Sequence, residues 1–418
     1  MLAFGAAIST APDHQRALDE ALPTALAQLG AEPHLVVCFF SMHHAPAAAG
    51  IALSLSERAG TSAIVGCTAD GVIGGARELE EGPALALWLA HLPGVQVRPF
   101  GLQVVAVEDG YGIAGWPEPE PGPPAAATVL LLADPFSFPA ERFLERLNEE
   151  QPGLEVVGGM VSGAGEPGGH RLLCGTEVLD AGAVGVALAG PVEVRSVVSQ
   201  GCRPIGAPFA VTRCDGNVVH ELGGRPAVER LRELLGALDP DDAALLRGGL
   251  QVGQVIDEHK ASFDRGDFLV RGLLGADPHD GSIALGDTVE VGQTLQFQVR
   301  DAAAADEDLA LLLAPVPGWR PRGALLFACN GRGRGFFGRP DHDAALVAAA
   351  TGQAPTAGFF AQGELGPVGG RNHLHTYSAS LAVFCEPRDP RAARVRRLAE
   401  AETATEVAVE PPADPEPV

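Results

Sequence analysis

The sequence is poor in basic side chains and almost devoid of lysine. Its 418 residues include 29 Lys and Arg against 53 Asp and Glu, a formal net charge of −24, and Lys260 is the only lysine. Nucleic acid and anionic membrane surfaces are repelled by such a chain, so we expect neither as its main partner. A small anionic ligand is not excluded, because it responds to the local field rather than to the net charge.

The chain also lacks a long apolar run and a paired-cysteine motif. Its most apolar stretch, residues 84–90, is too short to span a membrane. The N-terminus has no basic region of the kind that begins a signal peptide. The seven cysteines are odd in number and scattered, without a C-x-x-C pair. These features predict reduced, mostly buried thiols in a cytoplasmic protein.

Three segments of the chain share one pattern. Each has an apolar run, a helix-like stretch, a second apolar run and then a Gly-x-x-x-x-Gly frame, at residues 66–71, 158–163 and 358–363. A polar residue precedes the second glycine of each frame: Asp70, Ser162 and Gln362. We expect these three residues at equivalent strand ends, where α/β proteins commonly bind ligands. The alternative is a structural repeat with tight turns and no ligand.

The remaining pattern predicts an α/β protein with mixed β-sheets and flanking helices. Ser9 or Thr10 is expected to cap a helix over 12–29. Residues 85–91 and 95–107 are expected to form adjacent antiparallel strands, and 249–299 a β-meander. Strand–helix–strand units mixed with strand pairs fit either one doubly wound sheet or two packed sheets with helices outside. Residues 117–124 have the composition of an exposed Pro/Glu/Gly linker.

Residues 329–343 form the segment with the densest polar chemistry. A glycine-rich loop follows an apolar strand and carries Arg332, Arg334 and Arg339. Arginine forks bind carboxylates and phosphates, which favours an anion-binding role. The loop is not a P-loop, because the lysine is missing and the glycine spacing differs. The alternative is a structural loop with solvent-exposed arginines.

A second polar segment, residues 363–375, follows the third glycine frame. If the two strands of the third unit are neighbours, this segment lies near Asn330 and Arg332. The polar residues that it contributes are Glu364, Arg371, Asn372 and His375. A pocket with both charges suits a zwitterion, with arginine for the carboxylate and Glu364 for the amine. Arg203, beside Cys202 after another strand, is expected to contribute to the same cleft. A buried ion-pair network that holds the loops is the alternative.

The sequence gives weaker support for two other kinds of site, a metal site and a cysteine-dependent active site. His342, Asp343, His373, His375 and Cys329 are potential metal ligands, but no pair has a zinc-like spacing, so we expect no metal and no cofactor. Catalysis by Cys329 with His342 or His375, or by Cys67, is the enzymatic alternative. A cysteine at the end of an apolar strand is more commonly packed there.

These stretches taken together resemble the FIST family, named after F-box and intracellular signal transduction proteins. Residues 66–71, 158–163, 182–188 and 201–206 resemble FIST-N, and residues 266–271, 296–301, 329–333, 340–343 and 363–372 resemble FIST-C. The resemblance implies a sensory, ligand-binding protein with a FIST-N-like domain at 1–220 and a FIST-C-like domain at 221–386. Residues 387–418 would add a C-terminal helix over 387–400 and an acidic, Pro-rich disordered tail.

The resulting hypothesis is a cytoplasmic sensor that binds a small carboxylate-bearing ligand, such as an amino acid, and signals through a protein partner. The predicted binding residues are Asp70, Ser162, Arg203, Asn330, Arg332, Gln362, Glu364, Arg371 and Asn372. The first alternative is a cysteine-dependent enzyme. The second is a protein-interaction scaffold that binds no small ligand.

Overall fold

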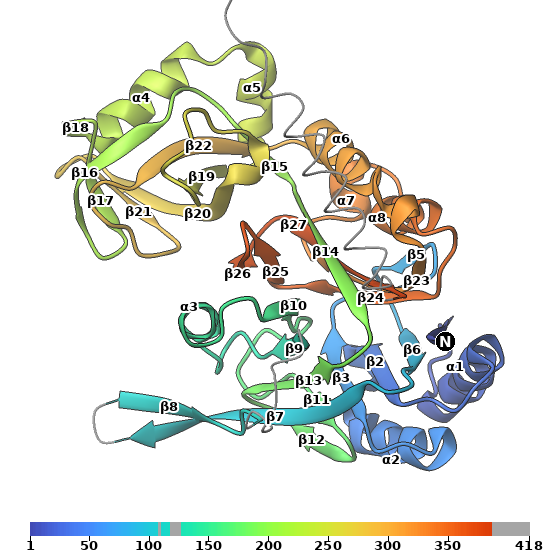
Figure 1. The fold of residues 1–418 in the computed structure, drawn as a ribbon. Helices are drawn as coiled ribbons and strands as arrows, with labels where there is room; N and C mark the ends of the chain where they lie inside the picture. Colours follow the sequence, from blue (N-terminus) through green and yellow to red (C-terminus); the bar gives the residue numbers. More distant parts are fainter. Residues whose placement is uncertain (108–109, 118–126, 387–418) are drawn as a thin grey trace, which may run out of the picture.

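The computed structural model describes residues 1–107, 110–117 and 127–386, and these residues form three mixed β-sheets and one antiparallel β-sheet, with flanking helices (Figure 1). The predicted fold class is therefore confirmed. Most of the predicted linker at 117–124 and all of the predicted C-terminal helix and tail lie outside the described residues. No helix in the described part of the chain has the length and apolar character needed to cross a membrane.

The first three sheets each contain one of the repeated units. Sheet one has the order β1 (Ala3–Ser9), β6 (Leu85–His91), β2 (Leu35–Ser41), β3 (Ile64–Ala69), β11 (Leu172–Cys174), β12 (Glu177–Leu179). Sheet two has the order β26 (Arg371–His375), β25 (Glu364–Val368), β10 (Glu155–Met160), β9 (Ala127–Ala133), β13 (Ala183–Ala189), β7 (Gln96–Val107), β8 (Gly110–Ala114). Sheet three has the order β14 (Glu193–Gln200), β27 (Ser378–Cys385), β23 (Pro321–Cys329), β24 (Thr356–Ala361), β4 (Val72–Gly74), β5 (Arg77–Leu79).

Sheet four and its helices form a separate lobe, at the upper left of Figure 1. Its strands are β15 (Cys202–Pro204), β22 (Thr294–Arg300), β16 (Phe209–Asp215), β17 (Val218–Leu222), β21 (Ser282–Leu285), β20 (Phe268–Asp277), β19 (Leu250–Val255) and the short β18 (Arg225–Pro226). The lobe also holds α4 (Ala227–Ala237), α5 (Pro240–Leu245) and the 3-10 turns η2 (Leu246–Gly248) and η3 (Arg265–Asp267).

Each repeated unit is a parallel strand pair joined by a helix. The pairs are β2 and β3, β9 and β10, and β23 and β24, and a later strand pairs antiparallel with the first strand of each. The connecting helices are α2 (Ala48–Ala59, after the 3-10 turn Met42–Ala47), α3 (Ala140–Glu150) and α8 (His342–Ala350, after α7, Arg334–Phe337). The three predicted units are therefore real structural repeats.

The first glycine of each frame is required by the backbone of the neighbouring strand. Gly66, Gly158 and Gly358 lie opposite Cys38, Leu131 and Leu326 in the three registers. A Cβ at these glycines would lie 2.2, 1.9 and 1.8 Å from the carbonyl oxygens of those partners. Contacts this short do not occur between real atoms, so the glycines permit the close approach of the paired strands.

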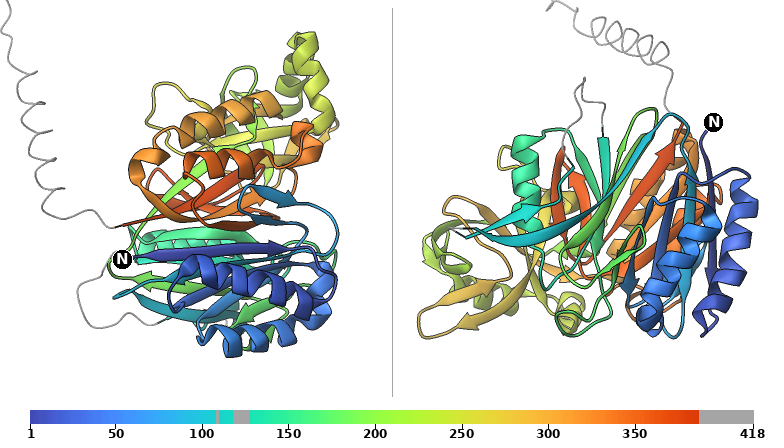
Figure 2. Two further views of the ribbon diagram at one scale, coloured as in Figure 1. Left: turned by 90° about the vertical axis from the view of Figure 1, so that its right-hand side faces the viewer. Right: turned by 90° about the horizontal axis from the view of Figure 1, so that it is seen from below.

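The three sheets bury one common core and carry their helices outside. On β2, Leu35, Val37 and Phe39 face the shared core, whereas Val36, Cys38 and Phe40 pack under α2 and α1 (His14–Leu29). The same alternation holds on β9 and β23, whose inner residues lie in the shared core. The outer residues of β9 pack beneath α3, and those of β23 pack beneath α8 and α6 (Ala302–Leu313). Figure 2 shows sheets one and three stacked between outer helix layers. Of the two predicted arrangements, the structure has packed sheets with helices outside.

Strands from distant parts of the sequence complete one another's sheets. β4 and β5 leave the first unit and extend sheet three, where β4 pairs with β24. β25 and β26 leave the third unit and extend sheet two, where β25 pairs with β10. The predicted FIST-N-like and FIST-C-like segments therefore share sheets two and three.

Two local predictions were wrong. Asp13 rather than Ser9 or Thr10 caps α1, because its side chain accepts from the Arg16 N–H, and residues 3–9 form β1. The strands at 85–91 and 96–107 do not pair with each other. The first lies between β1 and β2, and the second lies between β13 and β8 in another sheet.

Candidate functional site

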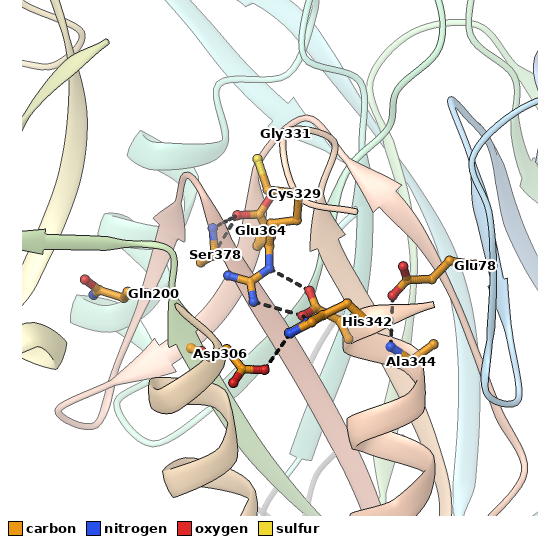
Figure 3. A network of polar contacts seen from close by, with 12 residues as sticks. Glu78, Gln200, Asp306, Cys329, Gly331, His342, Ala344, Glu364 and Ser378 are labelled. Carbon is orange, nitrogen blue, oxygen red and sulfur yellow. Dashed lines mark hydrogen bonds and ion pairs between the residues drawn. The ribbon is translucent and has the colours of Figure 1, made fainter. Parts of the chain in front are cut away.

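The densest group of buried polar side chains lies at the C-terminal ends of β23 and β24 (Figure 3). The glycine-rich loop after Cys329 leads into α7 and α8, and Gly333 has φ 78°. The carboxyl ends of parallel strands are where open α/β sheets bind ligands. A ligand site is therefore expected at the C-terminal ends of the third unit's parallel strands.

Arg332 is buried and bound to Asp343 by two hydrogen bonds. Its Nε and Nη2 donate to the two carboxylate oxygens over 2.6 and 3.0 Å, and Arg332 is only 3% exposed. Burial opposes ionisation of Asp343, but Arg332 and His342 outweigh it and lower the pKa of Asp343 to about 2. The Arg332 Nη1 group has no hydrogen-bond partner among the described residues.

His342 extends the pair toward the surface. Its Nδ1 lies 2.8 Å from Asp343 and its Nε2 lies 2.7 Å from Asp306 of α6. Its ring stacks on Phe337 with centroids 3.4 Å apart. With both ring nitrogens engaged, His342 is held as a structural link between α6 and α8.

Glu78 is a buried carboxyl group that sequence reasoning missed. It comes from β5 of the first repeated segment and accepts the Ala344 N–H at the start of α8 over 2.9 Å. Burial raises the pKa of Glu78 to about 7. Figure 3 shows Glu78 reaching Ala344 from outside the third unit.

Glu364 is fully buried beside Cys329 at the start of β25. Its Oε2 accepts the backbone N–H and the hydroxyl of Ser378 over 3.0 and 2.6 Å. Burial raises the pKa of Glu364 to about 8, against the opposing effect of the Ser378 hydrogen bonds and Arg332. Its Oε1 has no partner in the part of the chain that the structure describes.

Arg300, a residue that the sequence analysis did not select, adds a second guanidinium group. It donates to the Gly331 carbonyl and lies between the rings of Phe336 and Tyr377, at 4.8 and 5.0 Å from their centroids. Its Nε is buried without a partner among the described residues. The sequence signal for it was the stretch 296–301, which resembled FIST-C without indicating a binding role.

A cavity of about 420 Å³ opens beside this group. It is lined by Arg300, Gly331, Gly335 and Phe336, together with residues of α5 and η2. The outer end of the polar cluster is therefore accessible from the surface between the third unit and the sheet-four lobe.

The three residues that precede the second glycines lie near one another. The buried Ser162 hydroxyl accepts the Asp70 N–H over 2.9 Å and donates to the Phe360 carbonyl. The N–H of Gln362 donates to the Met160 carbonyl over 3.0 Å. The side chains of Asp70 and Gln362 are exposed. Ser162 thus joins the three repeats, and its hydroxyl is engaged on both sides.

The other predicted binding residues lie at different places. Arg203 pairs with Asp242 and Asp301 and links β15 to α5 and α6. Asn330 is exposed at the end of β23.

Arg371 and Asn372 lie at the far end of the β25–β26 hairpin, because Val368 pairs with Arg371 whereas Glu364 pairs with His375. They line a second cavity, of about 480 Å³, between α3 and the sheet-four lobe. Asn372 is engaged by Asn148, Leu154 and Val156. The predicted single pocket is thus divided between two places, with Arg332 and Glu364 together at one of them.

Burial disfavours ionisation of Cys329 and Cys202 in the cluster and of Cys67 in sheet one. Burial raises the pKa of both Cys329 and Cys202 to about 12, and that of Cys67 well above its ordinary value. Reactive cysteines have lowered pKa values, so these environments do not favour a nucleophile.

The Nε2 of His375 lies 3.0 Å from the Gly366 carbonyl, and burial lowers the pKa of His375 to about 3. Among the described residues, no three His, Cys, Asp or Glu side chains are grouped to hold a metal ion.

Comparisons with known proteins cover most of the chain. The FIST N domain profile matches residues 34–225 and the FIST C domain profile matches residues 227–367. An uncharacterized protein of Mycobacterium tuberculosis is 48% identical over 388 residues, which is 92% of this chain and 100% of that protein. An uncharacterized protein of Mycobacterium bovis is 46% identical over 388 residues, which is 92% of this chain and 99% of that protein.

Proposed function

Because the chain belongs to the FIST family, whose domains are sensory domains of signal-transduction proteins, we propose that it binds a small carboxylate-bearing ligand and signals through a protein partner. An amino acid is the ligand class that the charges favour. The binding site is the polar cluster around Arg300, Arg332 and Glu364.

One observation carries this proposal. Arg332 Nη1 and Glu364 Oε1 are polar atoms of two buried side chains, and neither has a partner among the described residues. A buried polar atom without a partner costs about 1–3 kcal/mol, more for a charged group. Folded proteins therefore rarely leave such atoms unpaired, and a functional role or a bound water or ion accounts for many exceptions.

The charges of the cluster suit the two ends of an amino acid. Arg300 and Arg332 flank Gly331 and offer N–H groups to a carboxylate. Glu364 offers an oxygen to an ammonium group. Because Asp343 already neutralises Arg332, and Glu364 is protonated below its pKa of about 8, these side chains carry little net charge apart from Arg300. A zwitterion has no net charge, so its binding leaves the net charge of the cluster unchanged.

The proposal is tested by a thermal-shift screen of the full chain against amino acids and organic acids. A ligand at a hundred times its Kd stabilises the fold by about 2.7 kcal/mol, which raises Tm by a few degrees. The Arg300→Ala variant should lose the shift, because Arg300 is only half-buried and its loss leaves the Arg332–Asp343 pair intact. Arg334→Ala, an exposed arginine of the same loop, is the matched control. No dose-dependent shift with any compound, from folded protein, contradicts the proposal.

A further inference from the structure

The unpartnered buried polar atoms of this protein are concentrated in one region. Twelve buried side-chain nitrogen or oxygen atoms lack a partner among the described residues, and seven of them surround the turn at Tyr377 and Ser378. Three of the seven belong to the charged cluster, namely Arg300 Nε, Arg332 Nη1 and Glu364 Oε1. The other four are amide atoms of Gln200, Gln251 and Gln298. The proposed function does not use these amides.

Gln251 and Gln298 lie on the face of sheet four that meets the rest of the molecule, and Gln200 lies at the end of β14 in sheet three. On β22, Leu295, Phe297 and Val299 pack with the α4 core, so Gln298 and Arg300 project from the opposite face. Gln298 pairs with Gln251 of β19, and Tyr377 lies beside Gln251.

Two contacts join this face to sheet three. The Gln200 amide of β14 donates to the Phe268 carbonyl over 2.6 Å, and the Thr376 hydroxyl donates to the Val270 carbonyl over 2.7 Å. The glutamines therefore continue the charged cluster inward along the boundary between the lobe and sheet three.

Gln298 is accommodated by a glycine on the neighbouring strand. A Cβ at Gly253 would lie 2.1 Å from Gln298 Nε2 and 2.8 Å from the ring of Phe268. The amide of Gln298 thus lies directly over the Gly253 backbone. Both its oxygen and its nitrogen lack a partner in the described structure. An exchange of the oxygen and nitrogen positions would therefore still leave the Gln298 amide without a partner.

The unpartnered groups define what a ligand must offer. The three glutamines present three unpaired oxygens, at Gln200, Gln251 and Gln298, and one unpaired N–H₂ group, at Gln298. These groups are uncharged, so they are satisfied by neutral N–H donors that come with a carbonyl acceptor. A primary carboxamide has this combination, whereas a carboxylate has only acceptors. An ammonium group has only donors and is better placed at Glu364.

We propose that the ligand carries a carboxamide as well as a carboxylate, with the carboxylate at Arg300 and Arg332 and the carboxamide at the Gln298 row. This proposal rests on the proposed function and names its ligand class: amino acids with an amide side chain and their close analogues, such as ureido amino acids. The site discriminates against the acid analogue, because the carboxylate of that analogue has no N–H group and leaves the glutamine oxygens unpaired. Sites built to bond an N–H group reject analogues that lack it by large factors.

The test is calorimetric titration of the full chain with matched pairs. L-glutamine is compared with L-glutamate and L-methionine, and L-asparagine with L-aspartate, and L-citrulline is included as a ureido ligand. We expect at least one amide or ureido ligand to bind at least tenfold more tightly than its acid or thioether counterpart. Equal affinity within each pair overturns this inference and leaves the proposed function standing. Binding by no amino acid or organic acid overturns both.

A variant of Gln298 tests whether this residue causes the preference for amide over acid ligands. Gln298→Met keeps the length of the side chain and removes its amide, so the preference for the amide ligand should fall at least tenfold while binding of the acid changes less than threefold. Gln103→Met, at an exposed position of β7, is the control. An unchanged preference in Gln298→Met contradicts the assignment. If that variant does not fold, the wild-type comparison of amide with acid decides the question alone.

Discussion

At the scale of single residues, Glu364 makes the stability of the protein depend on pH. Its pKa in the folded protein is about 8, above the ordinary value of 4.5. The folded state therefore holds the proton more tightly than the unfolded chain does. The stability that this proton contributes is complete below pH 4.5 and is lost as the pH rises through about 8.

We therefore expect the wild-type Tm to fall relative to that of Glu364→Gln by several degrees between pH 6 and pH 9. The amide keeps an acceptor for Ser378 but cannot ionise. Thermal unfolding followed across this range measures the difference, and the exposed Glu149→Gln serves as control. If Tm changes with pH in the same way for Glu364→Gln and wild type, Glu364 does not ionise in this pH range.

The Arg332–Asp343 pair gives a second residue-scale prediction. Both side chains are 1% exposed, so removal of one leaves a buried charge without its partner. Asp343→Ala should lower the free energy of unfolding by about 3–5 kcal/mol. Arg339→Ala, which breaks an exposed pair with Asp306, should cost less than about 1 kcal/mol. Urea unfolding of the two variants measures both values, and similar losses would contradict the assignment.

At the scale of elements, the first glycine of each repeated unit should tolerate no side chain. A methyl group at Gly158 or Gly358 would lie within 2 Å of a carbonyl oxygen on the paired strand. Each alanine variant should be strongly destabilised, by about 4 kcal/mol or more, or fail to fold. Gly236→Ala, in α4 with open space around it, should be neutral or stabilising. Soluble yield and Tm distinguish these outcomes.

The repeated units could be predicted from the sequence because their signals are local. Each unit joins strand, helix and strand within about 30–40 residues, and its apolar runs and glycines lie in one stretch of chain. The pairing of β6 with β1 and β2 could not be predicted in the same way. Residues 85–91 and 96–107 are adjacent in sequence, but burial on both faces of β6 places it between two strands from elsewhere.

The candidate site was predictable only in part for the same reason. Arg332 and Glu364 follow neighbouring strands of one unit, so the sequence places them together. Arg300 and Gln298 come from β22 of another sheet, and only the docking of the sheet-four lobe brings them to Gly331 and Tyr377. Arg371 was expected at the site because it is close in sequence, but the β25–β26 hairpin carries it to the opposite end.

At the scale of the whole molecule, the shared sheets predict that the two matched segments do not fold separately. A fragment of residues 1–225 lacks β24, β25 and β27, the partners of β4, β10 and β14. We expect this fragment and residues 226–418 each to be insoluble or partly unfolded when expressed alone. Co-expression should yield a complex with the circular dichroism and Tm of the intact chain. A cooperative thermal transition in either isolated fragment would contradict this.

The shared sheets also bear on how the chain folds during synthesis. β4 and β5 pair as a hairpin that ends at Leu79, and β24, the other neighbour of β4 in sheet three, begins only at Thr356. Some 277 residues separate these two positions, and at about 5–20 residues per second they take about 14–55 s to translate. During that time the buried strand β4 lacks its neighbour β24. Newly made chains should therefore depend on chaperones, and ribosome-bound intermediates should resist proteases only after residue 385 has emerged.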